Sequence, residues 1–372
     1  MKRGLQALIG LVIGALMVWL LFRDTDWKEV GEGIKRIHWG WFVAAQIPLW
    51  LSFPIRVQRW TYIVRVDRPV SFRHLFSATQ IGFLGNFVLP ARAGEGIRAL
   101  VLTRLSGIPF FKSFAMVGLD RVTDLFGLIA VVMVAVLAYQ PTEPVSIPAE
   151  TFGTAEPIVF GLRAYQVGAA LAAVSLVVVI AGFVAIYLNR KVVLRISDAI
   201  VGLVSTWLAQ KLHTAIDHFA DGLHVFKSPS DMSKSIGFSL ATWAISICFL
   251  YSVSKAFFPD IPWYLPFVMQ ALIAAGISIP GPPGFIGQFH IPVVIAFVML
   301  VPDVNVDHAK GAAIVMHLMN LPPVAILGVW SLLRENVGLF ELRREAAQAE
   351  EAAESQACVT ATRVRRVVSC YA

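Results

Sequence analysis

Long, uninterrupted runs of apolar residues dominate the chain, in place of the half-polar stripes that are typical of soluble helices. Most runs approach the ~20 residues that a helix needs to cross ~30 Å of hydrocarbon. The pattern predicts an all-α polytopic membrane protein with about six full spans. The expected spans are Leu5 to Phe22, Trp39 to Ile55, Leu119 to Tyr139, Val167 to Leu188, Ile236 to Phe257 and Ala309 to Leu333.

Two further apolar regions are interrupted by proline and glycine. The first runs from Phe72 to about Phe111, and the second runs from Trp263 to Val301. Because proline removes a backbone donor and clustered glycine destabilises a helix interior, neither region can form one continuous helix. Each is expected to form either a re-entrant hairpin or two short spans. The predicted helix breaks are Pro90, Gly94, Pro280, Gly284 and Gly287.

The charges of the connecting segments predict the orientation in the membrane. Lysine and arginine concentrate after Ile55, in residues 189–234 and after Leu333, whereas residues 140–162 hold three glutamates and no basic residue. The positive-inside rule places the basic segments and both chain termini in the cytoplasm. The two ends of each broken region then fall on the same side, which predicts an inverted repeat with halves at about 1–139 and 163–342. Interrupted helices in matching positions of such halves are typical of transporters.

The remaining segments differ from the spans in composition. Residues 189–234 place apolar positions near helical spacing between charged ones, which indicates an amphipathic cytoplasmic segment on the membrane surface. Residues 343–372 are expected to form a partly disordered cytoplasmic tail. The transmembrane domain therefore covers residues 1–342.

Composition narrows the functional classes. Hydrophobic residues make up 57% of the chain and charged residues 15%, compared with about 25% in soluble domains. The net charge of +7 comes from basic residues between apolar spans, so nucleic-acid binding is not expected. Recognised catalytic motifs are missing, and we expect no cofactor, no metal and no catalytic residue.

Ionised residues near the first break are the main candidates for a site. Arg92, Glu95 and Arg98 lie three positions apart, and Asp120 and Asp124 flank Arg121 in the following span. Charges inside a membrane pair with one another or face a wet cavity, and they are functional candidates by default. One alternative is that Glu95 and Asp124 only neutralise the arginines and lock the hairpin. The other is that a guanidinium remains free to hold a lipid phosphate.

Other polar residues receive weaker predictions. Arg56 and Arg59 are expected to be interfacial anchors whose side chains extend to the lipid headgroups. Gln288 and His290 follow the second break, and His317 lies within the last span. The two histidines could form a polar path or a proton-linked switch, since histidine titrates near neutrality, but a purely structural role is the favoured interpretation.

The motif Pro90-Ala-Arg92-Ala-Gly94-Glu95-Gly-Ile-Arg98, the pair Asp120-Arg121-x-x-Asp124 and the break from Pro280 to Gly287 resemble a known family. The chain is similar to the lysylphosphatidylglycerol synthase transmembrane-region family, also described as flippase-like or UPF0104 membrane proteins. The resemblance covers roughly residues 5–342. It implies movement of a lipid headgroup between leaflets, with Arg92, Glu95, Arg98, Arg121 and Asp124 as the motif positions. His290 and His317 stand where the family tends to have glutamate and arginine, so the lipid could differ from the usual phospholipid.

The leading hypothesis is a translocase in the cell (inner, cytoplasmic) membrane that binds an anionic phospholipid, a hopanoid or a polyprenyl-linked lipid. The alternatives are a membrane-embedded lipid-modifying transferase and a scaffold of an envelope lipid or glycan synthesis complex. The expected protein partner is either a second copy of this chain, in a homo-oligomer, or a lipid-synthesis enzyme. A transferase would alter lipids covalently, whereas a translocase would change only their leaflet.

Overall fold

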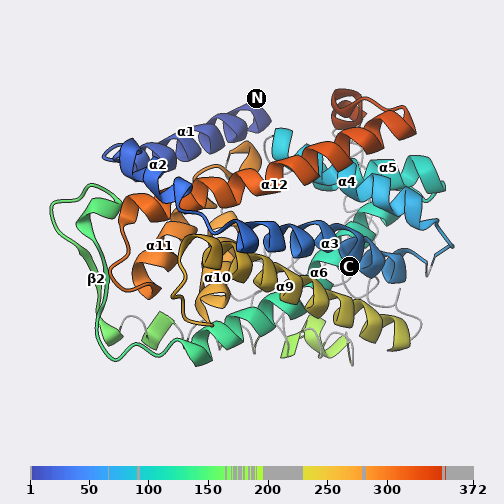
Figure 1. The fold of residues 1–372 in the computed structure, drawn as a ribbon. Helices are drawn as coiled ribbons and strands as arrows, with labels where there is room; N and C mark the ends of the chain where they lie inside the picture. Colours follow the sequence, from blue (N-terminus) through green and yellow to red (C-terminus); the bar gives the residue numbers. More distant parts are fainter. Residues whose placement is uncertain are drawn as a thin grey trace.

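The structure of the protein is a computed structural model. It describes residues 2–65, 67–89, 93–163, 229–278 and 282–345, with isolated positions between 166 and 195 and at 348. The described part is almost entirely helical, and its long helices lie side by side as an elongated bundle (Figure 1).

The first part of the chain forms six helices. They are α1 (Lys2–Phe22), α2 (Trp27–Lys35), α3 (Trp39–Val64), α4 (Phe72–Val88), α5 (Gly94–Ser106) and α6 (Phe110–Ala138). Asp26, His38 and Ser71 cap the N-termini of α2, α3 and α4, since their side chains accept hydrogen bonds from free backbone N–H groups there. Helix α3 begins where the span from Trp39 to Ile55 was expected but continues to Val64, so Arg56 and Arg59 lie within the bundle.

A small β-hairpin follows α6 at one end of the bundle. Strand β1 (Val145–Ile147) pairs antiparallel with β2 (Ile158–Phe160), and the 3-10 helix η2 (Ala149–Thr151) lies between them. The Arg23 guanidinium donates hydrogen bonds to the carbonyl oxygens of Phe152 and Gly153 at 2.9 and 2.6 Å, which attaches this loop to the end of α1. The helical prediction for the chain did not include these strands.

The second part of the chain adds four further helices and one turn of 3-10 helix. They are α9 (Pro229–Phe257), α10 (Leu265–Ser278), η3 (Pro283–Phe285), α11 (His290–Leu300) and α12 (Val306–Glu335). Helix α9 begins at Pro229, so the expected amphipathic segment 189–234 overlaps its first turns. Most of that segment, most of the expected span from Val167 to Leu188 and most of the tail lie outside the described residues.

Both predicted breaks interrupt the helices where the sequence indicated. Helix α4 ends at Val88 and α5 begins at Gly94, while α10 ends at Ser278 and α11 begins at His290. Figure 1 shows that α4 and α5 lie toward one end of the bundle and that α10 and α11 lie toward the other end. The inverted repeat itself remains a prediction. Pro90 and Pro280 lie outside the described residues.

Glycine has a different function in each break. Gly284 and Gly287 have φ angles of 68° and 83°, a left-handed conformation that glycine adopts without steric cost. Gly94 is helical, and a Cβ atom at this position would overlap the carbonyl oxygen of Gly82 on α4. Gly94 therefore allows close packing of α5 on α4.

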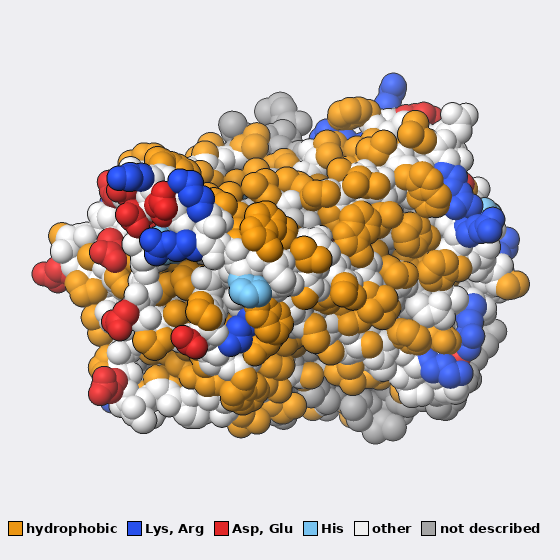
Figure 2. Space-filling view, viewed as in Figure 1, with side chains coloured by type: hydrophobic (Ala, Val, Ile, Leu, Met, Phe, Trp, Pro, Cys, Tyr) orange, Lys and Arg blue, Asp and Glu red, His pale blue; other side chains and the backbone are white. Residues whose placement is uncertain are grey.

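Apolar side chains fill the bundle and also cover its outside. One large core cluster involves mainly α9 to α12, and a second involves mainly α3 to α6. Figure 2 shows a broad hydrophobic band across the visible face, with most charged side chains gathered toward the two ends. Outward-facing apolar residues such as Val43, Ile47 and Leu333 are 61%, 70% and 76% exposed. This surface matches the expectation for a protein surrounded by hydrocarbon.

Four segments of the described chain are long and apolar enough to cross a membrane. They are Phe110–Ala138, Ser230–Phe257, Pro283–Leu300 and Val306–Glu335. Three of them overlap spans that the sequence pattern predicted, and the fourth combines η3 with α11. These helices confirm a multi-pass membrane protein, whereas the prediction of about six full spans remains untested.

Candidate functional site

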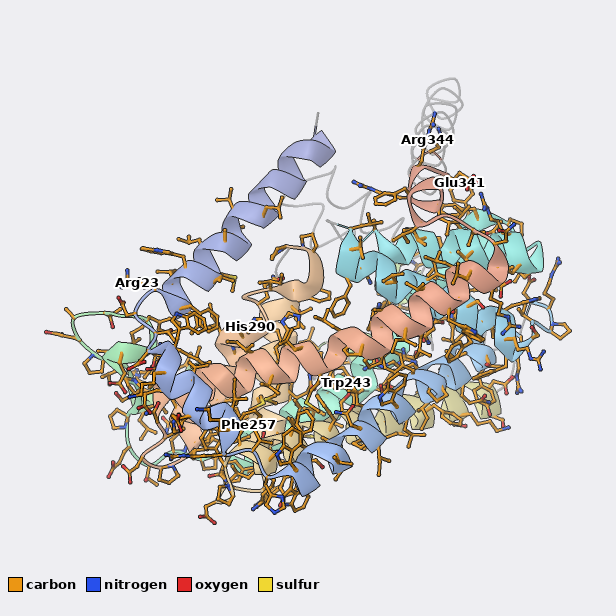
Figure 3. All side chains as sticks on the ribbon, turned by 45° about the horizontal axis from the view of Figure 1, so that its top comes forward. Arg23, Trp243, Phe257, His290, Glu341 and Arg344 are labelled. Carbon is orange, nitrogen blue, oxygen red and sulfur yellow. The ribbon has the colours of Figure 1, made fainter. Side chains whose placement is uncertain are left out.

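A cavity of about 350 Å³ lies inside the bundle, where the two broken regions face α3, α6, α9 and α12. Its ionised lining residues are Arg56, Arg121 and Asp124. Neutral polar side chains also line it, together with a larger set of aromatic and aliphatic ones. Figure 3 shows Trp243, which lines the cavity, and His290 inside the bundle near α12. This volume is within the range of about 300–1,000 Å³ that is usual for small-molecule sites.

A buried network of ion pairs lies next to the cavity. The Arg59 Nε atom donates to Asp120 Oδ1 at 2.9 Å, and Arg59 Nη1 also pairs with Asp124 Oδ1. Arg98 Nη1 donates to the second oxygen of Asp120 at 2.7 Å. Arg59, Arg98 and Asp120 are only 2%, 3% and 1% exposed. Because an unpaired buried charge is costly, this network holds α3, α5 and α6 in one arrangement.

Aromatic side chains and a second ion pair complete the network. The Arg98 guanidinium carbon lies 3.7 Å from the centre of the Trp60 ring, a cation–π contact. The Trp243 indole N–H donates to Asp124 Oδ1 at 3.0 Å, which joins α9 to α6. Arg121 pairs with Glu95 and remains 43% exposed. Because Arg121 also lines the cavity, its guanidinium combines a carboxylate partner with access to the open space.

Among the described residues beside the cavity, Arg56 is the cation that has no carboxylate within ion-pair distance, although Asp124 lies near enough to attract it. It is half-buried, lines the cavity, and forms no ion pair or hydrogen bond with any described side chain. Within the described residues, four guanidinium groups (Arg56, Arg59, Arg98 and Arg121) face three carboxylates (Glu95, Asp120 and Asp124). One positive charge is therefore in excess beside the cavity, and an anionic guest can neutralise it.

The two predicted histidines lie next to each other on the other side of the site. The rings of His290 and His317 have centroids 4.7 Å apart, and only His317 lines the cavity. His290 Nδ1 accepts a hydrogen bond from the Gly287 N–H at 3.2 Å. This bond holds the backbone of the second break.

The two broken regions meet at the cavity. The rings of Phe87 and Phe285 make an edge-to-face contact with centroids 6.2 Å apart. The Asn86 Oδ1 atom accepts the Gly94 backbone N–H at 3.0 Å, which satisfies a free donor at the start of α5. In the second break, Gln288 donates to the carbonyl oxygen of Gly276 at 3.1 Å. Polar side chains thus hold both breaks in their observed conformations.

The predicted site residues differ in whether they line the cavity. Arg121, Asp124 and His317 line the cavity. Glu95 and His290 lie behind Arg121 and His317 as their direct partners, whereas Arg98 pairs with Asp120, which does not line the cavity. Gln288 is 1% exposed and bonds to backbone, so it does not line the cavity. Arg92 lies outside the described residues.

The expectation that Arg56 and Arg59 are interfacial anchors was wrong. Helix α3 continues past Ile55 to Val64, which places both arginines within the bundle. A signal for this was present in the sequence, since apolar residues recur after Arg56 at Val57, Trp60 and Ile63. Asn86, Trp243 and Gln270 also line the cavity and were not predicted from the sequence. Gln270 offered a signal, because it is an amide within the apolar run of α10.

Comparison with known proteins agrees with this architecture. The family model for the lysylphosphatidylglycerol synthase TM region matches residues 7–328. The chain is 26% identical to a protein named glycosyltransferase AglD from Haloferax volcanii over 365 residues, which cover 94% of the chain and 57% of that relative. The chain therefore spans little more than half the length of this relative.

Two further relatives are UPF0104 membrane proteins from Methanothermobacter thermautotrophicus. One is 23% identical over 88% of the chain and 94% of its own length, and the other is 25% identical over 73% and 76%. No solved structure matches the chain. Since the family model covers most of the sequence, the chain belongs to the lysylphosphatidylglycerol synthase TM region family.

Proposed function

We propose that this protein binds the anionic headgroup of a lipid or lipid-linked molecule in its central cavity and moves it between the two leaflets. The observation that carries the proposal is the excess arginine charge inside a membrane bundle, with Arg56 free of any described carboxylate partner. A guanidinium group suits a phosphate because its planar N–H groups match two phosphate oxygens.

The surroundings of Arg56 support a transport role for the headgroup. Arg121 and Asp124 line the same cavity, and aromatic residues such as Phe53 and Phe87 surround the polar groups. A headgroup that leaves water must exchange its hydration for protein partners, since burying an unpaired charge is costly. The two broken regions supply backbone and polar side chains at the level of the membrane, a feature of transporter sites.

Reconstitution in liposomes tests the proposal. The purified protein is incorporated with fluorescently labelled phosphatidylglycerol or polyprenyl-phosphate lipids, and an impermeant quencher reports the fraction that reaches the outer leaflet. We expect faster exchange than in protein-free vesicles. Arg56→Gln is expected to slow it about tenfold or more, since hydrogen bonds to charged groups contribute about 1.5–3 kcal/mol.

Arg73→Gln is the matched control, because Arg73 is exposed and lies outside the central cavity. This variant should exchange lipid at the wild-type rate. Exchange no faster than in protein-free vesicles with either class of lipid would contradict the proposal.

A membrane-embedded lipid-modifying transferase is the second candidate. The name of the Haloferax relative favours it, because that protein is called a glycosyltransferase. Such an enzyme needs a general base, but each of the three carboxylates beside the cavity is already paired with arginine. Mass spectrometry of the lipids after incubation separates the two functions, since a transferase produces lipids of new mass and a translocase does not.

A further inference from the structure

The neutral polar residues that line the cavity indicate the chemical class of the headgroup more closely than the excess positive charge of the cavity does. Three amide side chains line it, namely Asn86 from α4, Gln270 from α10 and Asn320 from α12. They come from both broken regions and from the last long helix, so the folded chain brings together groups that are far apart in sequence.

Each amide has hydrogen-bonding capacity left over. Asn86 uses its oxygen for the Gly94 N–H, and Asn320 donates to the Met316 carbonyl at 2.8 Å. Among the described residues, the two N–H donors of Asn86 and the side-chain oxygen of Asn320 therefore have no partner. Gln270 forms no hydrogen bond with another described residue. Donors and acceptors are therefore both available, and a hydroxyl group can use both because it donates and accepts.

Asp124 adds an acceptor of the same kind. Its bonds to Arg59 and to the Trp243 indole both reach Oδ1, so Oδ2 has no partner among the described residues. This oxygen can accept a hydrogen bond from a hydroxyl, and the Trp243 ring beside it offers an apolar surface.

A headgroup with its own positive charge fits this cavity poorly. An ammonium group would lie in the same cavity as Arg56 and Arg121, where each neighbouring carboxylate already neutralises a guanidinium group. A quaternary ammonium could contact the aromatic rings, but it offers no hydrogen bond to the three amides. Leaving buried polar groups unpaired costs about 1–3 kcal/mol each.

From these residues we infer that the cavity takes a glycosyl phosphate headgroup, in which the phosphate binds Arg56 and Arg121 and the sugar hydroxyls bind the amides and Asp124. This inference rests on the proposed binding of an anionic headgroup. It goes further by naming a hydroxyl-rich, net negative group in preference to an aminoacylated or choline-bearing one.

Binding of soluble headgroup analogues to the full chain in nanodiscs tests the inference. Titrations followed by phosphorus-31 NMR compare glucose 1-phosphate, glycerol 3-phosphate, phosphocholine and inorganic phosphate. We expect glucose 1-phosphate to bind about tenfold more tightly than any of the other three, which corresponds to 1.4 kcal/mol. Arg56→Gln should weaken binding of all four.

Gln270→Met together with Asn320→Leu removes two amides with little change in side-chain volume. This variant should lose the preference for glucose 1-phosphate and keep the wild-type affinity for inorganic phosphate. The single variant Gln46→Met is the control, because Gln46 is also an amide but lies on α3 outside the cavity lining. It should retain the full preference, and its melting temperature together with that of the double variant reports whether each remains folded.

Three results overturn the inference. They are phosphocholine or glycerol 3-phosphate binding as tightly as glucose 1-phosphate, an unchanged preference in the folded double variant, and no binding by any phosphate. The binding assay does not depend on movement between leaflets. Sugar-phosphate binding without lipid exchange would therefore support the inference and contradict only translocation, whereas exchange without a sugar preference would contradict the inference alone.

Discussion

At the residue scale, the ion pairs differ greatly in their expected energetic importance. Arg59 touches both Asp120 and Asp124 and is 2% exposed, whereas Arg65 pairs with Asp231 near the end of α3 and its side chain is 42% exposed. Breaking a buried pair leaves an uncompensated charge, which typically costs about 3–5 kcal/mol. Exposed pairs contribute about 0–1 kcal/mol.

Arg59→Ala is therefore expected to destabilise the protein by about 3–5 kcal/mol, because two carboxylates lose their shared partner. Thermal unfolding in detergent measures the change. Arg65→Ala is the matched control and should stay within about 1 kcal/mol of wild type. Equal melting temperatures for the two variants would show that the Arg59 network does not stabilise the bundle.

At the element scale, the packing of α5 on α4 depends on glycine. A Cβ at Gly94 would overlap Gly82 O and Asn86 Oδ1, and the Gly82 atom is backbone, which cannot rotate away. The same hairpin carries Glu95 and Arg98, whose ion pairs reach α6. A shift of α5 therefore alters the charged network as well as the packing.

Gly94→Ala is expected to destabilise the protein by about 1–3 kcal/mol, the usual cost of overpacking. Gly118→Ala on α6 serves as its control, because a Cβ at that position meets no other atom within 4 Å. The control should be neutral or up to about 1 kcal/mol more stable, since alanine favours helix. Chemical denaturation followed by tryptophan fluorescence compares the two, and a neutral Gly94→Ala would contradict the close approach.

At the scale of the whole molecule, the two broken regions lie toward opposite ends of the bundle (Figure 1). The hairpin of α4 and α5 begins after Arg68 and is followed by Lys112, while Asp260 and Asp303 flank α10 and α11. All four residues are exposed. The basic pair should be cytoplasmic by the positive-inside rule, which places the acidic pair outside.

Single cysteines at these four positions test this orientation in a background with Cys248, Cys358 and Cys370 replaced by alanine. A membrane-impermeant maleimide applied to intact cells should label Asp260→Cys and Asp303→Cys. It should label Arg68→Cys and Lys112→Cys only after the membrane is permeabilised. Labelling of one member of a pair without the other in intact cells would show that its broken region crosses the membrane.

Much of the helical architecture could be predicted because it depends on local sequence. Unbroken apolar runs indicate membrane helices, and clustered proline and glycine interrupt them whatever surrounds them. The end of a helix was harder to predict at α3, where Arg56 and Arg59 resembled the close of a span. Burial among the neighbouring helices, together with the carboxylates of α6, allows the helix to continue to Val64.

The sequence by itself determined that this chain is a multi-pass membrane protein with two broken helical regions and an ionised motif, because hydropathy and backbone stereochemistry act over a few turns. Only the tertiary structure decided which charges neutralise one another. Asp120 and Asp124 lie beside Arg121 in sequence, yet they pair with Arg59 and Arg98 from other helices. Arg56 is left facing the cavity because ion pairing depends on distances between helices, which sequence spacing along one helix does not specify.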